Sequence, residues 1–268
     1  MCRSRYFDEY LHDELVDGTV KCFVYLGAGE ESIPAGVAQA FIDMKIRPNV
    51  FAQHRNHGIL CSFGADMKTV KDELLGLTTG TTGGIGGDPC HHAPNASHGC
   101  ILGHSGLIAD QIPIAIGVAF GSRQWSVCFL GDSSVEEDVW GPSLGFAVTH
   151  NVPVLFIECD DGLSVITEVS KRRSWDSVEI ARAYGLECDA EESDDPFVIL
   201  KAVRYLTEDT GPKYLRVKTC RKYRHVGPGT DGPMKWDRMA MVRERMGEAG
   251  IEIEQAAKRE MAELWAIG

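Results

Sequence analysis

The sequence predicts an α/β fold in which a doubly wound, mostly parallel sheet carries helices on both faces, in three layers. Its 268 residues are enough to bury one large core. Short, continuous apolar runs of the kind that form buried parallel strands recur along the chain. Helical patterns separate these runs, and such repeated alternation of strand and helix is typical of this fold class.

The composition is that of an ordinary globular protein and excludes several classes of function. Apolar residues make up 44% of the chain and charged residues 25%, which excludes disordered and fibrous proteins. The formal charge of −12 leaves no basic stripe to neutralise phosphates, so we expect no nucleic-acid partner. No apolar run approaches the roughly 18 residues that span a bilayer, so we expect no membrane partner.

The start of the chain and the cysteines indicate a cytoplasmic protein. Residues 1–5 lead into a polar and charged stretch, from which we expect no signal peptide. The nine cysteines are an odd number and stand singly, unlike the dense cysteines of a secreted disulfide scaffold. We therefore expect the chain to be reduced and cytoplasmic.

In the first half of the chain, the apolar pattern predicts few regular elements. Residues 21–26 form an apolar run that predicts a strand or the end of a buried helix, and Gly27 and Gly29 end it. Residues 34–44 have helical apolar spacing, and residues 49–52 predict a short strand. Nine glycines within residues 76–106 predict a long loop without regular structure, and loops of that length are usually functional.

The second half alternates more regularly between strand and helix. Gly185 is placed to end one of its helices, and Pro196 stands in the first turn of another. The predicted elements are, in order, helix 110–121, strand 126–130, helix 144–149, strand 154–157, helix 177–184, helix 197–206 and strand 214–218, followed by a loop at 227–233 and a charged amphipathic tail. We find no internal repeat or linker, so residues 1–268 are expected to form one domain, with a loop at 76–106 and a loop and helix at 219–268.

Two acidic residues follow neighbouring predicted strands. Asp132 comes just after strand 126–130, and Asp161 closes the acidic stretch that follows strand 154–157. Ligands of open α/β sheets bind at the carboxyl ends of the strands, and carboxylates supplied by different strand ends suit Mg²⁺. Acids after strands also cap turns and helices, so the spacing by itself leaves a structural role open.

Several motifs resemble a known enzyme family. Gly131-Asp132-Ser133, followed by Glu158-Cys159-Asp160-Asp161, resembles the thiamine diphosphate signature, which is Gly-Asp-Gly followed by Asn-Asn after an apolar strand. Further segments resemble the alpha subunits of 2-oxoacid dehydrogenases of the pyruvate, acetoin and branched-chain types. The resemblance implies that this chain is a short variant of such a subunit. In order they are residues 29–32, 54–58, 73–76, 83–87 and 103–113, and then Arg221 with His225.

The resemblance implies a thiamine diphosphate-binding fold and a role for each matching residue. Asp132, Asp161 and the backbone carbonyl of Leu163 would hold Mg²⁺, which bridges the diphosphate. Arg55 would pair with a diphosphate oxygen, a contact that suits a guanidinium. The full set implied to bind thiamine diphosphate is His54, Arg55, Gly106, Ile108, Gly131, Asp132, Ser133, Ser134, Asp161, Leu163 and His225.

The resemblance also implies a reaction and a partner. The chain would be the alpha-type subunit of an enzyme that decarboxylates a small 2-oxo acid and transfers the resulting acyl or aldehyde unit. His225, His104 and His91 are the candidate catalytic residues, and His92 is an alternative substrate contact. In this family a beta-type subunit supplies the glutamate that activates the aminopyrimidine, so activity would need that partner, in an alpha2beta2 heterotetramer.

The sequence departs from the family pattern at the proposed metal site and in the glycine-rich loop. Ser133 replaces the second glycine of the signature, and Asp160-Asp161 replaces Asn-Asn, which leaves open which aspartate is the ligand. An added negative charge predicts tighter metal binding and weaker retention of the diphosphate. The segment from Gly86 to His92 also differs from the family's Gly-Gly-Ser-Met-His. This difference indicates that the substrate is not pyruvate or that the acceptor is not a lipoyl domain.

Other functions remain as alternatives. The chain could serve an acyloin-forming or transketolase-like carboligase of a specialised pathway, or be a degenerate paralogue that binds a partner without turnover. Gly27-Ala28-Gly29 matches part of an NAD-binding turn but lacks its third glycine. A cluster of zinc-type ligands lies in the glycine-rich loop, without a Cys-x-x-Cys pair, and consists of Cys90, His91, His92, His98, Cys100 and His104.

Overall fold

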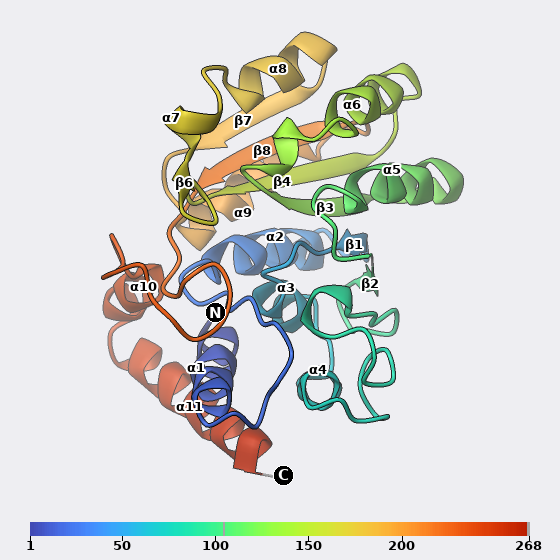
Figure 1. Ribbon diagram of the computed structural model, residues 1–268. Coiled ribbons are helices and arrows are strands. Elements are labelled where there is room, and N and C mark those ends of the chain that lie inside the picture. The colour runs from blue at the N-terminus through green and yellow to red at the C-terminus, as the bar shows by residue number, and fades with distance from the viewer. Residues whose placement is uncertain (104, 267–268) are drawn as a thin grey trace.

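A six-stranded sheet lies at the centre of the computed structural model, which describes residues 1–103 and 105–266 (Figure 1). All five pairings between neighbouring strands of this sheet are parallel. In spatial order the strands are β2 (Cys100–Leu102), β1 (Asn49–Phe51), β3 (Ser126–Gly131), β4 (Val154–Asp160), β8 (Lys213–Lys218) and β7 (Glu187–Glu191). The predicted α/β class with a mostly parallel sheet is confirmed.

Helices cover both faces of the sheet, as the doubly wound prediction requires. One face carries α5 (Gln111–Ser122), α6 (Trp140–Thr149) and α8 (Ser177–Tyr184), and the other carries α2 (Ser32–Asp43), α3 (His57–Ser62) and α9 (Pro196–Leu206) (Figure 1). Side chains of β3 alternate between the two faces. Phe129 packs into the core beneath α2 and α9, and Leu130 packs into the core beneath α5 and α6.

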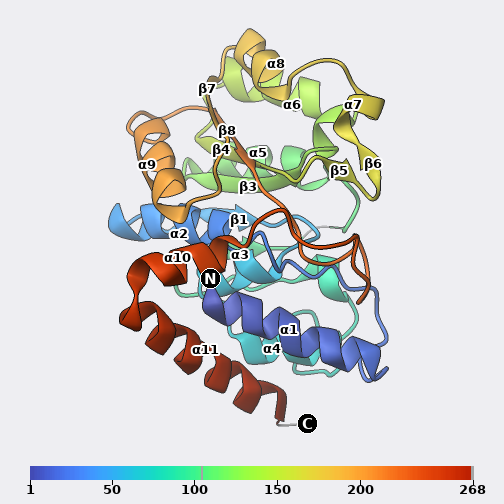
Figure 2. The same cartoon turned by 90° about the vertical axis from the view of Figure 1, so that its left-hand side faces the viewer.

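A further layer of helices lies outside α2 and α3. It consists of α1 (Cys2–Val16), α4 (Met67–Leu74), α10 (Arg238–Met246) and α11 (Glu248–Ala266), and Figure 2 shows α1 between α3 and α11. The buried Arg5 of α1 pairs with Glu31 at the start of α2, and its Nη1 lies 2.9 Å from Asp237 Oδ2 before α10. The two ends of the chain are thereby fixed to the same side of the molecule.

The start of one helix, the end of another and the burial of two strands agree with the sequence predictions. The Asp195 carboxylate accepts a hydrogen bond of 3.0 Å from the Phe197 N–H and so caps α9, with Pro196 in the first turn. Gly185 ends α8 in a left-handed conformation with a φ of 103°. Strands β3 and β4 are buried along nearly their whole length, which explains their continuous apolar character.

Two predictions for the first half of the chain were wrong. Residues 21–26 form neither a strand nor the end of a helix, because their backbone groups pair singly with loops: the Tyr25 N–H donates to Asp88 Oδ2 at 2.8 Å, and the Val24 carbonyl accepts from the Gly227 N–H. The alternative of an NAD-binding turn therefore lacks its strand. The predicted loop at 76–106 contains the edge strand β2 and a short helix, η1 (Asp88–Cys90).

The elements that the sequence analysis missed are short or polar. They are α1, α3, α4, the edge strand β7, the four-residue helix α7 (Val169–Arg172), η2 (Ser134–Glu136), and a hairpin of β5 (Leu163–Ser164) and β6 (Thr167–Glu168). Strand β7 is polar because it lies at the sheet edge and is partly exposed along its length. Within the described residues, no helix combines the length and the apolar character needed to cross a membrane.

The contact between α2 and α9 depends on a glycine, and this gives a first testable prediction. A Cβ at Gly36 would lie 2.7 Å from the Pro196 carbonyl oxygen and 2.9 Å from Ile199 Cβ. We expect Gly36→Ala to push the two helices apart and to lower the free energy of unfolding by about 1–3 kcal/mol. Chemical denaturation followed by circular dichroism measures this change.

Gly117 of α5 provides the matched control, because a Cβ built there would meet no described heavy atom within 4 Å apart from its chain neighbours and the nearby backbone of its own helix. Gly117→Ala should raise the free energy of unfolding by up to about 1 kcal/mol, since alanine is the better helix former. Equal stability of the two variants would contradict the tight packing of α2 against α9.

Candidate functional site

A pocket opens at the edge of the sheet where β1, β3, β4 and β8 end. Strand β1 has β2 on one side and β3 on the other, and such a reversal of strand order creates the crevice in which open α/β sheets bind ligands. A second pocket, of about 670 Å³, continues from the first towards the start of α5. The two pockets share the residues Gln53, His54, Ser133, Ser164 and His225.

Every residue that the resemblance assigns to the cofactor lines at least one of these pockets. The first pocket contains His54, Arg55, Gly131, Asp132, Ser133, Asp161, Leu163 and His225. The second contains His54, Gly106, Ile108, Ser133, Ser134 and His225. The fold thus brings together segments that are far apart in the sequence.

Asp132 lies at the end of β3 and faces the first pocket. Its side chain is buried, and its Oδ2 lies 2.7 Å from Nη2 of Arg172. Burial raises the pKa of Asp132 to about 6, and the neighbouring Asp161 adds to this rise while Arg172 opposes it. Asp132 and Asp161 both line the first pocket, and a divalent cation between two such carboxylates would offset their repulsion.

The two consecutive aspartates at the end of β4 have different surroundings. Asp160 is paired with Lys218, which lies directly opposite it on β8, and it accepts a hydrogen bond of 3.0 Å from the Gly162 N–H. Asp161 lines the pocket, with its Oδ2 3.2 Å from Nη1 of Arg221. The Leu163 N–H donates to Asp161 Oδ1 at 2.9 Å, which fixes the backbone turn that follows the strand. Asp161 is therefore the better placed of the two candidate ligands.

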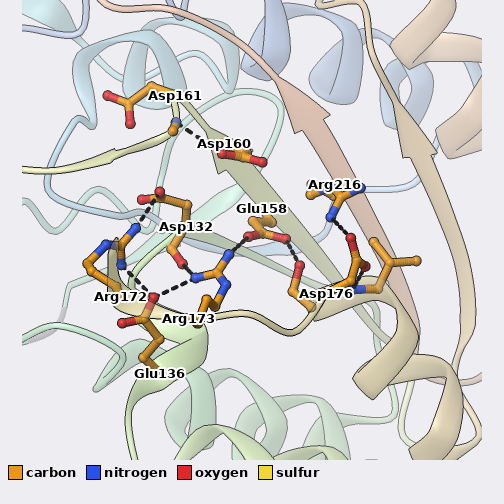
Figure 3. A network of polar contacts seen from close by, with 12 residues as sticks. Asp132, Glu136, Glu158, Asp160, Asp161, Arg172, Arg173, Asp176 and Arg216 are labelled. Carbon is orange, nitrogen blue, oxygen red and sulfur yellow. Dashed lines mark hydrogen bonds and ion pairs between the residues drawn. The ribbon is translucent and has the colours of Figure 1, made fainter. Parts of the chain in front are cut away.

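Two arginines of the segment around α7 pair with acidic residues beside the first pocket (Figure 3). Arg172 contacts both Asp132 and Glu136, the latter at 2.5 Å. Arg173 lies 2.6 Å from Glu136 and 3.5 Å from the buried Glu158, and it also donates to the backbone carbonyl of Asp132. These ion pairs hold α7 against the turn after β3. The sequence analysis assigned the arginines no role.

Arg55 follows β1 on the opposite side of the first pocket. Its Nε lies 3.3 Å from Glu30 Oε1, and its Nη1 donates to the Leu26 carbonyl at 3.0 Å. Burial raises the pKa of Glu30 to about 8, although Arg55 opposes this rise. The sequence analysis quoted Glu30 within a matching motif without giving it a role, and the structure places it in the pocket.

His225 reaches the junction of the two pockets from the loop after β8. Its Nδ1 is 3.5 Å from Nη2 of Arg55. Its ring packs against Tyr25 and His54 at centroid distances of 5.3 and 5.2 Å. Burial lowers the pKa of His225 to about 4, and Arg55 and Arg221 lower it further. The imidazole is therefore neutral near pH 7, with one nitrogen able to donate a hydrogen bond and the other able to accept one.

The second pocket has an acceptor that the sequence analysis missed. The buried Gln111, at the start of α5, donates from Nε2 to the Phe129 carbonyl at 2.9 Å. Its Oε1 is buried without a hydrogen-bond partner among the described residues, and Gln111 lines this pocket. Gly106 lies opposite, with a φ of 82°, and a Cβ there would lie 3.1 Å from Pro89 Cγ. The signal that could have found Gln111 is its place in the matching segment 103–113.

The candidate catalytic histidines differ in their surroundings. His91 is buried and does not line either pocket, and its Nδ1 lies 2.8 Å from the Thr81 hydroxyl oxygen. His92 is exposed and also lies outside both pockets. His104 lies outside the described residues.

Among the described residues, the zinc-type ligands Cys90, His91, His92, His98 and Cys100 of the glycine-rich loop do not form a cluster with one another. His92 and His98 are exposed, while His91 is buried. In the described part of the chain, His91 groups instead with His57 of α3 and Asp88 of η1. The candidate metal ligands of this region therefore come from α3, from η1 and from the residue that follows η1.

Comparison with known proteins identifies the family. The family model for the dehydrogenase E1 component matches residues 1–251. The alpha subunit of acetoin:2,6-dichlorophenolindophenol oxidoreductase from Bacillus subtilis is 27% identical over 235 residues, which cover 84% of this chain and 69% of that protein. The subunit of the same name from Cupriavidus necator is 28% identical, over 82% of this chain and 68% of that protein.

A pyruvate dehydrogenase is also similar. The E1 component subunit alpha of this enzyme from Zymomonas mobilis is 24% identical over 246 residues, which cover 88% of this chain and 67% of that protein. The matches span about two thirds of the length of these three relatives. The chain belongs to the dehydrogenase E1 component family, and its resemblance to the alpha subunits of thiamine diphosphate-dependent 2-oxoacid dehydrogenases is confirmed.

Proposed function

We propose that the chain is an alpha-type subunit that anchors the diphosphate of thiamine diphosphate through Mg²⁺, in an enzyme that decarboxylates a small 2-oxo acid. The observation that carries this proposal is the first pocket, where the carboxylates of Asp132 and Asp161 face a site that also holds Arg55. Mg²⁺ is usually bound by one or two carboxylates together with phosphate oxygens of a ligand. Asp132, Asp161 and the Leu163 carbonyl would hold the ion, and Arg55 would pair with the diphosphate.

The second pocket suits the aminopyrimidine part of the cofactor. The unpartnered Gln111 Oε1 offers a buried acceptor for an amino group, and burial makes an unmet hydrogen bond costly. Gly106 and Ile108 line the same pocket, where the glycine allows a flat ring to approach closely. The lining of both pockets therefore fits the two ends of one elongated ligand.

The site is incomplete in a way that calls for a partner subunit. None of the described residues that line the second pocket carries a carboxyl group, so the acid that would activate the aminopyrimidine must come from elsewhere. Apolar side chains are exposed at this pocket: Leu107 is 66% exposed, Ile108 47% and Val165 48%. Such an apolar patch is typical of an interaction surface. A beta-type subunit would cover this patch and supply the glutamate, in an alpha2beta2 heterotetramer.

The residues of this chain divide the work of the proposed reaction. Thiamine diphosphate, when bound, supplies the carbanion that attacks a 2-oxo acid and the electron sink for decarboxylation. The neutral imidazole of His225 donates a hydrogen bond to the substrate or to the diphosphate, and Arg55 fixes the orientation of His225. Catalytic roles for His104 and His91, and a cytoplasmic location, remain predictions from the sequence.

The first test concerns cofactor binding. Thiamine diphosphate and Mg²⁺ at about one hundred times the dissociation constant should stabilise the chain by about 2.7 kcal/mol, a rise of roughly 5–10 °C in the thermal unfolding midpoint. Asp132→Asn should lose most of this rise, because it removes one metal-binding charge without changing the shape of the side chain. Asp209→Asn, an exposed aspartate on the loop before β8, is the control and should keep it.

The same experiment tests the alternative of a degenerate paralogue. If the wild-type chain gains no stability from thiamine diphosphate and Mg²⁺, either alone or co-expressed with a beta-type subunit, the cofactor proposal is wrong and the degenerate alternative is supported. A gain that is equal in the wild type and in Asp132→Asn would place the ligand away from Asp132.

The second test concerns the aspartate that replaces the second asparagine of the family signature. Asp161→Asn should weaken Mg²⁺ binding and tighten binding of the diphosphate, because one negative charge beside the phosphate oxygens is removed. Two unit charges about 4 Å apart interact by roughly 4 kcal/mol at an effective dielectric of 20. Arg221, 3.2 Å from Asp161, offsets part of this repulsion. We therefore expect a change of about 1 kcal/mol, or roughly fivefold in affinity.

Isothermal titration calorimetry at saturating Mg²⁺ measures this effect, with Asp160→Asn as the matched control. Asp160 is paired with Lys218 outside the pocket lining, so its substitution should change the affinity for thiamine diphosphate less. Unchanged or poorer cofactor binding by Asp161→Asn would contradict the prediction that the charge of Asp161 weakens retention of the diphosphate.

The third test identifies the reaction. Co-expressed with its beta-type subunit, the chain should reduce an artificial dye in the presence of one member of a panel of 2-oxo acids and acetoin. Decarboxylation of a 2-oxo acid, or cleavage of acetoin, leaves an aldehyde-level unit, and its oxidation to an acyl product transfers two electrons to the dye. Product formation from two carbonyl compounds without dye reduction would favour the alternative of an acyloin-forming or transketolase-like carboligase. The structure offers one observation for that alternative: His91, which the resemblance places beside the substrate, lies outside both pockets.

A further inference from the structure

A buried cluster of histidine and aspartate side chains lies outside both pockets, between the glycine-rich loop and the outer helices. His57 of α3 and Asp88 of η1 are fully buried, and His91 is 4% exposed. Each offers one ligand atom, and these three atoms all lie within 4.8 Å of one another. Asp8 of α1 lies on the far side of His57.

The three facing atoms of this cluster lie close together, and one of them lacks a hydrogen-bond partner. Asp88 Oδ1 forms an ion pair with His57 Nε2 at 2.8 Å and lies 3.9 Å from His91 Nε2. Among the described residues, His91 Nε2 is buried without a hydrogen-bond partner. A tetrahedral zinc ion with bonds of about 2.0–2.1 Å has ligand atoms about 3.3 Å apart, a spacing that lies between the two observed distances.

The outer nitrogens of both histidines are already held by oxygen atoms. His57 Nδ1 lies 2.6 Å from Asp8 Oδ1, and His91 Nδ1 lies 2.8 Å from the Thr81 hydroxyl oxygen. Histidines that bind a metal through one ring nitrogen usually bond the other to a carboxylate or another oxygen, which fixes the ring. The remaining ring nitrogen of each histidine, Nε2, therefore lies on the side of Asp88 Oδ1, and the three atoms surround a common point.

Charge also favours a divalent ion in this cluster. Asp8 and Asp88 are buried carboxylates, and buried charges need compensation. A proton on His57 would balance one of them but would leave His91 Nε2 without a partner. A divalent cation would balance both charges and engage all three facing atoms.

We propose that His57 Nε2, Asp88 Oδ1 and His91 Nε2 bind a Zn²⁺ ion that is separate from the proposed Mg²⁺ site. Two imidazoles and one carboxylate suit zinc, whereas Mg²⁺ prefers oxygen ligands alone. Because the cluster is buried away from both pockets, the ion would have a structural role. It ties the glycine-rich loop to α3 directly and to α1 through Asp8.

The site would also connect the loop to the cofactor pocket. Asp88 Oδ2 accepts a hydrogen bond of 2.8 Å from the Tyr25 N–H, and Tyr25 lines the second pocket. The Asp88 carbonyl accepts a hydrogen bond of 2.6 Å from Asn56 Nδ2, next to Arg55. Loss of the ion should therefore loosen residues 76–106 and lower stability, whether or not thiamine diphosphate is bound.

Metal analysis of the full-length chain tests the proposal. Purified from zinc-supplemented medium and dialysed against Mg²⁺ buffer, the wild-type chain should retain about one zinc ion, and Co²⁺ in its place should give visible absorption bands. Asp88→Asn and His91→Ala should lose the ion. Thr81→Val should weaken its binding by about 10- to 100-fold, because Thr81 positions His91. Asp132→Asn should retain zinc, so this test is independent of the cofactor site.

His98→Ala and His92→Ala are the matched controls, since both histidines are exposed in the same loop and should not affect zinc content. If His91→Ala does not fold, removal of zinc from the wild type by a chelator should still lower its thermal midpoint, and added Zn²⁺ should restore it. A wild-type chain that binds neither Zn²⁺ nor Co²⁺ would overturn the proposal, as would loss of zinc in His98→Ala or His92→Ala with retention in His91→Ala.

Discussion

The candidate site depends on the in-register parallel pairing of β3 with β4. Gly131 at the end of β3 lies opposite Cys159 near the end of β4, so the residues that follow both strands emerge at the same edge. Asp132 and Asp161 are consequently close enough for one carboxylate to raise the pKa of the other. Strands β1 and β8 end at the same edge and add Arg55 and Arg221. The backbone hydrogen bonds of the sheet thus set the geometry of the charged groups.

Each acidic group at this edge has a basic partner from another segment. Asp132 pairs with Arg172, Asp160 with Lys218 and Asp161 with Arg221. The aspartates that replace the family's Asn-Asn therefore do not add an uncompensated charge. Lys218 sits opposite Asp160 in the β4–β8 ladder, and Arg221 follows shortly after on the same segment. This chain has accommodated the extra carboxylates by cations placed beside them on β8 and the loop that follows it.

The sequence was sufficient to predict which segments line the two pockets, but not every lining residue or the contacts between them. Asp132 and Asp161 could be found because apolar strands precede them, and parallel strands of one sheet end together. Gln111 and Glu30 lay within matching segments, but nothing in the sequence showed which of their atoms would be buried without a partner. Arg172 and Arg173 could not be found, because their ion pairs join residues of separate elements and have no periodic pattern. The contact of Asp8 with His57 was missed because α1 was not predicted as a helix.

The errors in the fold also have physical causes. Residues 21–26 are apolar because Val24 and Leu26 are buried in the core, yet their backbone is satisfied by single hydrogen bonds to loops, so burial alone did not produce a strand. Strand β2 was not predicted because glycines surround it in the sequence. Gly99, just before β2, lies against Val50, and a Cβ there would be 2.8 Å from Val50 Cγ2. In that position glycine allows close approach at the sheet edge and does not indicate disorder.

The pairing of Asp132 with Arg172 has a consequence for how an ion would enter the pocket. The guanidinium of Arg172 pairs with a carboxylate of the proposed Mg²⁺ site, so binding of the ion would exchange one cation for another. The net affinity for the ion would be the difference between the two attractions, and a displaced Arg172 would be able to turn towards an incoming anion. Binding of the metal ion would thus free a cation for the diphosphate, so that each ligand would favour binding of the other.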